Sequence, residues 1–421
     1  MFFTYRFLTT LIFPLLALII FIRKFLNKED LTRYKEKFIL NKFISKIQNP
    51  IWFHGASIGE IKSIIPIIKH LTKKDSKIKI LITSVTLSSA KIVEIEFKNF
   101  ENICHHYFPL DVPFLTSKFL DIWKPKLVIF IDSEIWPNFL YEIKKRNISL
   151  VLLNGRITKK TFSRWMFLGK FSKEVFSFFD ICLAASKDSY NNLLKLGARN
   201  VKFYGNLKYI SDNENKTILN KKLVNQLNKY KVWCATNTHE GEDKICIQAH
   251  KEIRKEYDTV LTIIIPRHIN RVNNILKLCT NEGLSTQILT EENSINENVE
   301  ILLINSFGNL LKYYKYCKSV FIGKSLIKKL ELVGGQNPIE AAQQGCQIYH
   351  GPYVYNFNEV YNYFNENNIS KVINDSKELS TNIINDFKSS KNVDFNKIKK
   401  IDTYGRTIFQ HTISELKEFI E

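Results

Sequence analysis

The sequence contains no closely paired cysteines, no internal repeat and no low-complexity tract. Its cysteines are odd in number, seven in all; none forms a CxxC pair and most lie in apolar runs. This spacing excludes a disulfide framework and a short zinc motif, and it is typical of reduced core residues in a cytoplasmic protein. The adjacent histidines His105 and His106 have no ligand-spaced partners nearby, so we expect no metal site there.

Acidic residues are scarce relative to basic ones. The chain has 41 Asp and Glu against 61 Lys and Arg, which gives a formal net charge of +20. Such an excess favours an anionic partner: nucleic acid, an acidic membrane surface or a phosphorylated substrate. A general compositional bias explains the charge equally well, because Lys, Asn and Ile are abundant throughout. A nucleic-acid-binding protein would gather its basic residues in a patch with stacking aromatics, whereas these lysines are spread along both halves.

Only one long apolar run is present, at Phe7–Ile22, and it is interrupted by Thr9, Thr10 and Pro14. It is shorter than the roughly 20 residues that comfortably span a bilayer. Arg23, Lys24 and Lys28 follow it, and this flank predicts that the rest of the chain stays in the cytoplasm. No small-x-small cleavage pattern follows the run, so a membrane anchor is favoured over a signal peptide or a buried core helix. Whether the anchor spans the membrane or lies in its interface stays open.

Two domains are expected from the length of 421 residues. In both halves, apolar runs alternate with amphipathic segments such as Ile61–Leu71 and Lys159–Phe179, which predicts βαβ units and parallel sheets. The strands expected in the first half are Ile51–His54, Ile78–Thr83, Leu127–Ile131, Leu150–Leu153, Ile181–Ala184 and Val201–Tyr204. Those expected in the second half are Val232–Ala235, Val260–Ile265, Val299–Ile304, Val320–Ile322 and Gln347–Tyr349.

A polar stretch at 211–230 without a strand-like run separates the two halves. We therefore expect an anchor at 1–28, one Rossmann-like domain at 29–215, a second at 216–402 and an amphipathic helix at 403–421. The predicted fold class is α/β with two doubly wound domains.

A carboxylate follows the first strand at the point where a helix should begin. The small residues Gly55 and Ala56 end the strand, and Ser57 and Glu60 follow. Carboxyl ends of strands in an open α/β sheet face the ligand crevice, so Glu60 is placed where a general base is needed. Ser57 and Glu60 also have the spacing of a capping box, in which the glutamate reaches back to the helix start. On these residues alone, the cap is the better explanation.

Four further charged residues follow strands of the first half. Asp132 and Glu134 come after Leu127–Ile131, where an acid-x-acid pair can bind a metal or complement the start of a helix. Arg156 and Lys208 each follow a later strand. A single cation after a strand is usually solvated surface, so the residues alone do not assign a role to either.

The second half has similar segments at its strand ends. In Gly334–Ala342, Asn337 can cap a helix with Pro338 as its first residue and Glu340 as its third. A helix start suits phosphate, and the two glycines allow close backbone approach. In isolation the same residues are an ordinary cap. The other strand-end candidates are Pro266, Arg267 and His268, and Phe307, Gly308 and Asn309.

From about Ile51 to about Asn358, these segments resemble the bacterial 3-deoxy-D-manno-octulosonic acid (Kdo) transferases, which attach Kdo to the lipid A precursor. The resemblance implies a GT-B fold, with an acceptor domain and a CMP-sugar donor domain facing a cleft and the C-terminal helix returning to the first domain. It also implies an inverting transfer of Kdo from CMP-Kdo to a lipid IVA-type acceptor in lipopolysaccharide biosynthesis. The place of the reaction would be the cytoplasmic face of the cell inner membrane, with no nucleic acid as a partner.

The resemblance assigns roles to matching residues. Glu60 matches the catalytic base, and Asp132 and Lys208 match groups associated with transition-state stabilisation. The residues that match the segments holding CMP are Pro266, Arg267, Phe307, Gly308, Asn309, Asn337, Pro338, Ile339 and Glu340.

The chain departs from the family pattern at several positions. Asp132 stands where the family has Glu, Lys324 where it has Gly, and Gln336 where it has His. No metal or other cofactor is expected, because a nucleoside monophosphate leaving group offers no diphosphate for a metal to chelate. The alternatives are another membrane-associated GT-B transferase that uses a UDP-sugar, a basic membrane-anchored nucleic-acid-binding protein, and a non-catalytic relative.

Overall fold

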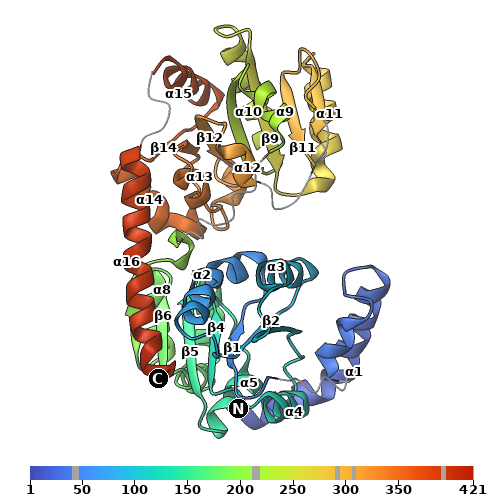
Figure 1. The fold of residues 1–421 in the computed structure, drawn as a ribbon, viewed down its shortest axis with the longest axis vertical. Helices are drawn as coiled ribbons and strands as arrows, with labels where there is room; N and C mark the ends of the chain where they lie inside the picture. Colours follow the sequence, from blue (N-terminus) through green and yellow to red (C-terminus); the bar gives the residue numbers. More distant parts are fainter. Residues whose placement is uncertain (40–46, 211–218, 290–293, 306–309, 390–394, 421) are drawn as a thin grey trace. The chain divides into compact units, whose positions relative to one another are not determined.

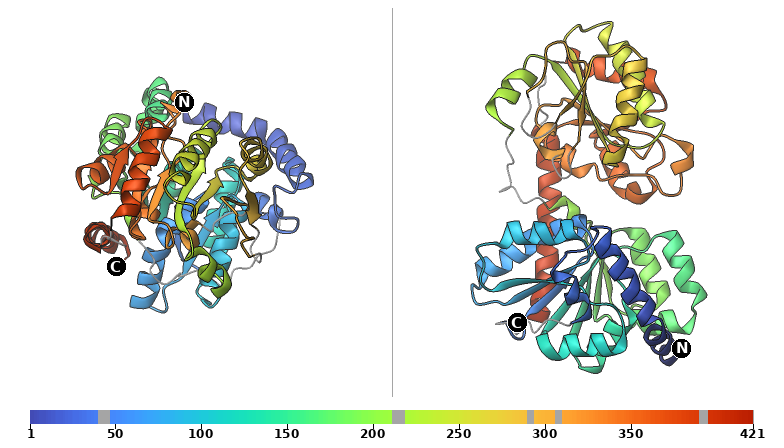
Figure 2. Two further views of the ribbon diagram at one scale, coloured as in Figure 1. Left: turned by 90° about the horizontal axis from the view of Figure 1, so that it is seen from above. Right: turned by 90° about the vertical axis from the view of Figure 1, so that its right-hand side faces the viewer.

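The computed structural model describes residues 1–39, 47–210, 219–289, 294–305, 310–389 and 395–420. The chain divides into two compact units, one made of Met1–Asp212 with Gly405–Glu421 and the other of Asn213–Tyr404. Each unit contains a seven-stranded sheet with helices packed on it (Figure 1), and Figure 2 shows the same layers from two further directions.

The sheet of the first unit is parallel throughout, in the order β3-β2-β1-β4-β5-β6-β7. Strand order reverses between β1 and β4, which pair in the register Ile51↔Leu127. Ligands of open α/β sheets bind at this kind of reversal, outside the carboxyl ends of the strands. The strands are β1 (Ile51–His54), β2 (Ile80–Ser84), β3 (Ile103–Tyr107), β4 (Leu127–Ile131), β5 (Ser149–Gly155), β6 (Ile181–Ala184) and β7 (Val201–Phe203).

Helices cover both faces of this sheet. In Figure 1, α2 and α3 lie on one face and α4 and α5 on the other, where Trp52, Phe119 and Phe139 are completely buried. Pro113 and Pro137 stand at the first turns of α4 and α5, where a missing N–H costs nothing. The helices are α1 (Phe2–Phe25), η1 (Arg33–Phe38), α2 (Ile58–Lys74), α3 (Leu87–Phe97), α4 (Pro113–Trp123), α5 (Pro137–Lys145), α6 (Lys159–Phe167), α7 (Lys170–Phe176), α8 (Lys187–Leu196), η2 (Leu207–Tyr209) and, from Gly405 on, α16 (Phe395–Ile420).

The second unit repeats this plan with a parallel sheet in the order β10-β11-β9-β8-β12-β13-β14, which reverses between β8 and β12. Its strands are β8 (Lys231–Thr238), β9 (Val260–Pro266), β10 (Thr286–Leu289), β11 (Ile301–Ile304), β12 (Ser319–Ile322), β13 (Gln347–His350) and β14 (Ser370–Val372). Its helices are α9 (Lys221–Leu227), α10 (Glu242–Arg254), η3 (Ile269–Arg271), α11 (Val272–Asn281), α12 (Leu310–Tyr314), η4 (Lys328–Leu330), α13 (Ile339–Gln343), η5 (Tyr355–Phe357), α14 (Asn358–Glu366) and α15 (Ser376–Lys388).

The α/β architecture expected from the sequence is confirmed, and every expected strand is present with small shifts at its ends. Four local predictions were wrong or incomplete. The helix expected over Lys159–Phe179 is two helices, because Gly169 between them has a left-handed φ of 51°. The polar stretch at 211–230 contains α9, the last helix begins at Phe395, and the N-terminal helix extends well beyond the apolar run.

Candidate active site

Glu60 lies in the first turn of α2, directly after β1. Its Oε2 accepts a hydrogen bond from the backbone N–H of Ala56 at 2.6 Å, and the Ser57 hydroxyl donates to its Oε1 at 2.7 Å. The backbone N–H of Glu60 donates to the Ser57 hydroxyl at 3.4 Å, so the capping box expected from the sequence is confirmed. The same hydrogen bonds hold a half-buried carboxylate at the carboxyl edge of the sheet.

Asp132 and Glu134 follow β4, the strand that neighbours β1 at the reversal of strand order. Asp132 is buried and has a left-handed φ of 61°. Its backbone N–H donates to Leu153 and its carbonyl accepts from Arg156, both at 3.0 Å, which ties the turn to the end of β5. The fold thus brings three carboxylates from two segments to one edge of one sheet.

The environment of Glu60 disfavours its charged form. Burial raises the pKa of the Glu60 carboxyl, and the negative charges of Asp132 and Glu134 raise it further, against the lowering effect of the hydrogen bonds from Ser57 and Ala56. A carboxylate with a raised pKa accepts a proton more readily, which is the property that a general base requires.

His54, the last residue of β1, was not singled out by the sequence. It is completely buried and contacts the Thr83 hydroxyl through Nδ1 at 2.9 Å and Glu134 Oε2 through Nε2 at 3.1 Å. The indole N–H of Trp52 donates to the same hydroxyl at 2.8 Å. A carboxylate only accepts hydrogen bonds, so Nε2 of His54 is the nitrogen that donates to Glu134.

Glu134 is therefore held in its charged form. Burial raises the pKa of the Glu134 carboxyl, but the hydrogen bonds from His54 and from the Trp136 indole N–H, at 2.8 Å, lower it overall. The sequence gives no signal for the role of His54 beyond its place at the end of a buried strand, because its partner Glu134 is far away in the sequence.

Lys208 is half-buried in η2, a short turn that lies against α2. Asn206 caps this turn by accepting the Lys208 backbone N–H at 3.0 Å, and Asn154 at the end of β5 accepts the Leu207 N–H at 3.0 Å. These contacts bring Lys208 to the same edge of the sheet as Glu60. Arg156 also lies at this edge, through its backbone hydrogen bond to Asp132.

In the second unit, Pro266 ends β9 and is buried, while Arg267 and His268 directly after it are exposed. The Arg267 backbone N–H donates to the Thr238 carbonyl at 3.2 Å, next to the end of β8. The Pro266–His268 segment therefore lies beside the strand-order reversal of the second sheet.

Glu242, at the start of α10, binds the backbone segments that follow β8 and β12, the two strands at this reversal. The sequence did not predict this role. The Glu242 side chain is completely buried and accepts four backbone N–H bonds. Oε2 accepts from His239 at 2.8 Å and Lys324 at 2.7 Å, and Oε1 accepts from Ser325 at 2.8 Å and Leu326 at 3.0 Å. One carboxylate thus holds the turn after β12, where the unusual Lys324 adopts a left-handed φ of 61°.

The predicted cap at Asn337–Glu340 is displaced by one residue. The five-residue helix α13 begins at Ile339 with Pro338 as its cap, and the Asn337 amide oxygen accepts the Ile339 N–H at 3.2 Å. Pro338 and Ile339 are buried, whereas Asn337 and Glu340 are half-buried.

The glycines before this helix allow a close approach of backbone, as the sequence predicted. A Cβ at Gly334 would clash with the carbonyl of Tyr353, and one at Gly335 (φ 91°) would lie 2.9 Å from the carbonyl of Val354. The backbone that approaches them is the chain's own, in the segment after β13. Phe307, Gly308 and Asn309 lie outside the described residues.

Comparison with known proteins shows which family this chain resembles. Residues 32–211 match the family described as 3-deoxy-D-manno-octulosonic-acid transferase (kdotransferase). A 3-deoxy-D-manno-octulosonic acid transferase of Rickettsia bellii is 30% identical over 83% of this chain and 82% of its own length. The transferase of Haemophilus influenzae is 28% identical over 74% of this chain and 72% of its own length.

Solved structures share the fold. A UDP-N-acetylglucosamine 2-epimerase superposes with a TM-score of 0.60 at 13% identity, over 89% of this chain and 97% of its own. The UDP-GlcNAc 2-epimerase of Neisseria meningitidis gives 0.57 at 16% identity, over 87% and 100%. These likenesses support the GT-B fold of two Rossmann-like units and, at such identities, nothing more specific. The family itself is shown by the match to the Rickettsia bellii enzyme, with the family match over residues 32–211. This chain is therefore a glycosyltransferase that belongs to the family of Kdo transferases.

Proposed function

We propose that this enzyme transfers Kdo from CMP-Kdo to a phosphorylated lipid A precursor of the lipid IVA type, with inversion at the anomeric carbon. The observation that carries the proposal is Glu60, a half-buried carboxylate with a raised pKa at the carboxyl edge of the first sheet. Glu60 lies within the part of the chain that matches the Kdo transferase family, and the relatives of this chain carry the name of that enzyme.

The reaction is a single displacement. Glu60 takes the proton from a glucosamine hydroxyl of the acceptor as that oxygen bonds to the anomeric carbon of Kdo. The bond from this carbon to the phosphate oxygen of CMP breaks, and CMP leaves with the electron pair. Asp132 stabilises positive charge that develops on the sugar, and Lys208 offsets negative charge on the departing phosphate or the Kdo carboxylate.

Residues of the second unit hold the CMP part of the donor. Arg267 is exposed at the end of β9, where its cation can reach a phosphate, and Glu340 in the first turn of α13 can accept hydrogen bonds from ribose hydroxyls. Pro266, Asn337, Pro338 and Ile339 shape this region, and Phe307, Gly308 and Asn309 complete the set by family resemblance.

The acceptor is an amphiphile, so the enzyme works at a membrane surface, which we assign to the cytoplasmic face of the inner membrane. The helix α1 is long and apolar enough, by length and composition, to insert into a membrane. The net charge of +20 favours a phosphorylated acceptor among anionic lipids.

The test is an assay of the purified, detergent-solubilised protein with CMP-Kdo, generated in situ, and a tetra-acylated lipid A precursor. We expect one CMP released for each Kdo transferred, with equal rates in EDTA, because the leaving group carries a single phosphate. UDP-sugars serve as the control donors. Transfer from a UDP-sugar but not from CMP-Kdo would refute the donor assignment, and CMP-Kdo binding without transfer would refute the acceptor.

A further inference from the structure

One stripe of α1 packs along the first unit over the whole length of the helix. The residues of this stripe recur every three or four positions, which places them on one helical face. They are buried or half-buried, and they are Phe2, Tyr5, Arg6, Thr9, Phe13, Leu16, Ala17, Ile20, Arg23 and Lys24.

Polar contacts fix the N-terminal end of α1 to α5 and to the segment just before α4. The Tyr5 hydroxyl donates to Asp111 at 3.0 Å, and Arg6 forms an ion pair with the buried Glu142 at 2.8 Å. The Asn138 amide, itself completely buried, donates to the Thr9 hydroxyl at 3.1 Å. Breaking these contacts would leave buried polar groups unpaired, which is costly.

The C-terminal end of α1 is fixed to the same unit. Arg23 pairs with Glu29 at 2.6 Å, and the other oxygen of Glu29 accepts from Lys37 at 2.6 Å. Glu29 and Lys37 are both buried, and Lys37 also donates to the carbonyl of Val85 after β2 at 3.3 Å. Both ends of the helix are therefore attached to one side of the molecule.

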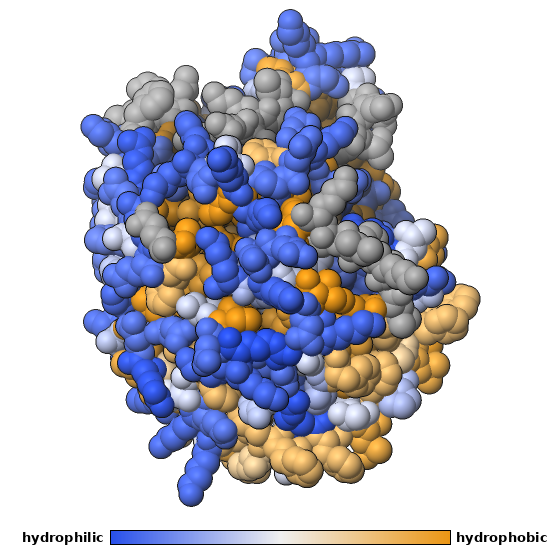
Figure 3. Space-filling view, turned by 60° about the horizontal axis from the view of Figure 1, so that its bottom comes forward, coloured by the Kyte–Doolittle hydropathy of each residue, from blue (hydrophilic) through white to orange (hydrophobic). Residues whose placement is uncertain are grey.

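The opposite face of α1 is apolar and exposed. Phe3 is 83% exposed, Leu11 65% and Phe25 70%, and Figure 3 shows a band of apolar side chains along the lower right of the face drawn there. The remaining exposed apolar residues of α1 are Phe7, Leu8, Ile12, Leu15, Leu18, Ile19, Phe21 and Ile22. A monomeric soluble protein rarely exposes so large a continuous apolar surface.

The apolar surface continues beyond α1 near its N-terminal end and beside its middle. Phe167, at the end of α6, is 90% exposed, and the neighbouring Trp165 packs against Phe171, which contacts Phe2 at 4.8 Å between ring centroids. Phe114 on α4 is 48% exposed and contacts Phe13 at 5.0 Å.

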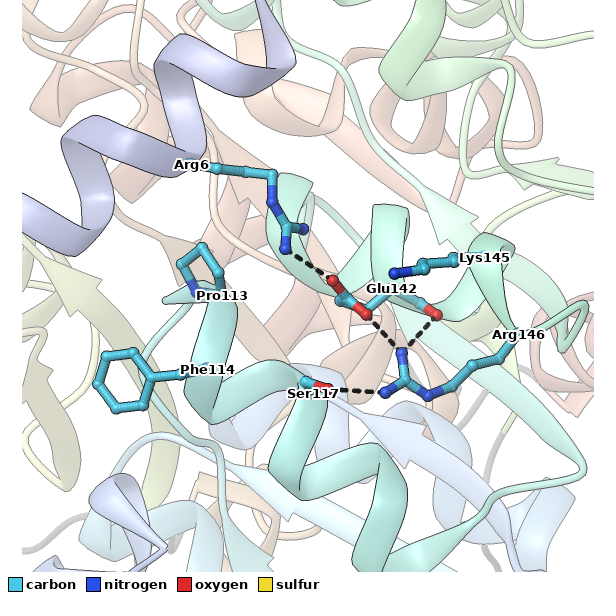
Figure 4. A pocket seen from close by; sticks show the side chains of 7 residues that line it. All are labelled: Arg6, Pro113, Phe114, Ser117, Glu142, Lys145 and Arg146. Carbon is cyan, nitrogen blue, oxygen red and sulfur yellow. Dashed lines mark hydrogen bonds and ion pairs between the residues drawn. The ribbon is translucent and has the colours of Figure 1, made fainter.

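Basic residues and an open groove border this surface. Exposed lysines and arginines are close to its residues in the sequence: Lys28 follows Phe25, and Lys160, Arg164 and Lys170 flank Phe167. A groove of about 620 Å³ runs from Phe114 and Pro113 to Lys145 and Arg146, with Arg6 of α1 on its wall. In Figure 4, Glu142 joins Arg6 to Arg146, and Lys145 lies at the same end without a drawn contact. An apolar surface with a cationic rim is complementary to an anionic lipid surface.

We propose that α1 lies in the plane of the membrane as a monotopic element and does not cross it. The exposed face of α1, Phe167 and Phe114 insert into one leaflet, and Lys145 at the groove meets an anionic lipid headgroup. A crossing helix places its ends on opposite sides of a hydrocarbon layer about 30 Å thick, which is incompatible with both ends held by one unit. The inference rests on the membrane association proposed above and not on the transfer reaction.

The test measures depth along one face of α1. Thr4, Leu11, Leu18 and Phe25 are exposed and seven residues apart, so they share a face. Each is replaced by Cys, spin-labelled in the full chain and reconstituted in phosphatidylcholine–phosphatidylglycerol vesicles, with the unmutated chain as the blank for its native cysteines. We expect four similar, shallow depths of about 5–10 Å.

Other depth profiles would overturn the proposal. Labels that are deepest at positions 11 and 18, with positions 4 and 25 reached by impermeant reagents from opposite sides, would show a spanning helix. Labels shielded from both lipid and water would show that a second copy of the chain covers the surface. Neither profile depends on Kdo transfer, so a failed transfer assay leaves this test intact.

A second arm tests the residues outside α1. Phe167→Glu should lower the vesicle partition coefficient about tenfold, because an inserted phenyl group is replaced by a charge. Ile95→Glu is the matched control: Ile95 is 64% exposed on α3, on the opposite face of the sheet. Both variants should keep transfer activity on detergent-dispersed acceptor. Equal partitioning of the two variants would contradict the insertion of Phe167.

Discussion

Neighbouring carboxylates at the edge of the first sheet have opposite electrostatic environments. Burial and two negative neighbours raise the pKa of Glu60, while His54 and Trp136 lower that of Glu134. Such a separation is a common way in which an active site assigns different roles to similar groups. Glu60 is suited to accept a proton, and Glu134 is suited to remain an anion that raises the proton affinity of Glu60.

The sequence placed Glu60 and Asp132 at strand ends because each follows a strongly apolar strand, and the family resemblance supplied their expected roles. The sequence did not predict His54 or Glu242, because the role of each side chain depends on hydrogen-bond partners that only the fold brings close. His54 meets Glu134 across two strands, and Glu242 meets a turn that lies far along the chain.

The raised pKa of Glu60 predicts the pH dependence of transfer. A group with a raised pKa keeps its proton to a higher pH, and Glu60 can act as a base only after it has lost that proton. In the pH–rate profile, activity should therefore rise with pH, and the midpoint of this rising limb should lie above 4.5, the ordinary pKa of Glu. Glu134→Gln removes a negative neighbour, which lowers the pKa of Glu60 and moves the limb to lower pH by a few tenths of a unit. The measurement is kcat/KM as a function of pH.

The control for this shift is Glu94→Gln, which removes an exposed carboxylate from α3. It should leave the limb where it is. A limb that moves to higher pH in Glu134→Gln would contradict the electrostatic account of Glu60.

Central strands were easier to predict from the sequence than edge strands. The interior strands β1, β4 and β6 are apolar at nearly every position and are buried on both faces, and their predicted bounds are confirmed. The strands that escaped prediction, β3, β10 and β14, all lie at sheet edges. They contain polar residues and are partly exposed, so neither an apolar run nor strict alternation distinguishes them from loops.

The turn after β12 depends on Glu242, so Glu242→Gln should destabilise the second unit. The amide replaces one acceptor oxygen with an NH2 group that faces two backbone N–H donors. We expect a loss of about 2–4 kcal/mol, measured by chemical denaturation, with faster hydrogen exchange at the Lys324 and Ser325 amides.

Glu252→Gln is the control, because Glu252 is an exposed carboxylate on the same helix α10. It should change neither quantity. Unchanged exchange at Lys324 in Glu242→Gln would show that the turn does not depend on this carboxylate.

The helix α16 lies close to the turn that carries Lys208. The closest approach is at Gly405, where an added Cβ would clash with the carbonyl oxygen of Tyr209. Gly405→Ala should therefore destabilise the first unit by about 1–3 kcal/mol, although Ala is favoured over Gly in helices by up to about 1 kcal/mol. Transfer should also slow, since the clash displaces the Lys208 turn. Thermal denaturation and kcat measure the two effects.

The matched control for stability is Gly59→Ala in α2, where no atom lies within 4 Å of the added Cβ. That variant should be as stable as the wild type or more stable. A stabilising effect of Gly405→Ala would mean that the close approach to Tyr209 is not required.

At the scale of the whole molecule, the sequence predicted two α/β units. Apolar strand-like runs alternate with amphipathic segments in both halves, and this pattern indicates sheets covered by helices. The sequence did not predict how α1 packs, because its partners Asp111, Asn138 and Glu142 are scattered in later segments. Asp111 also accepts the backbone N–H groups of Asn138 and Phe139 at the start of α5, and burial raises the pKa of its carboxyl to about 6. The apolar helix and the segment after Glu134 therefore share one buried polar network.

The most direct test of the account is the transfer rate of Glu60→Gln with CMP-Kdo and the tetra-acylated precursor, beside Glu378→Gln. Glu378 caps α15 much as Glu60 caps α2, so the pair separates the cap from the chemistry. We expect Glu60→Gln to bind CMP normally and to lose transfer by at least about 100-fold, while Glu378→Gln transfers Kdo at close to the wild-type rate. A Glu60→Gln enzyme that is folded and transfers Kdo at the wild-type rate would contradict the central claim that Glu60 is the base.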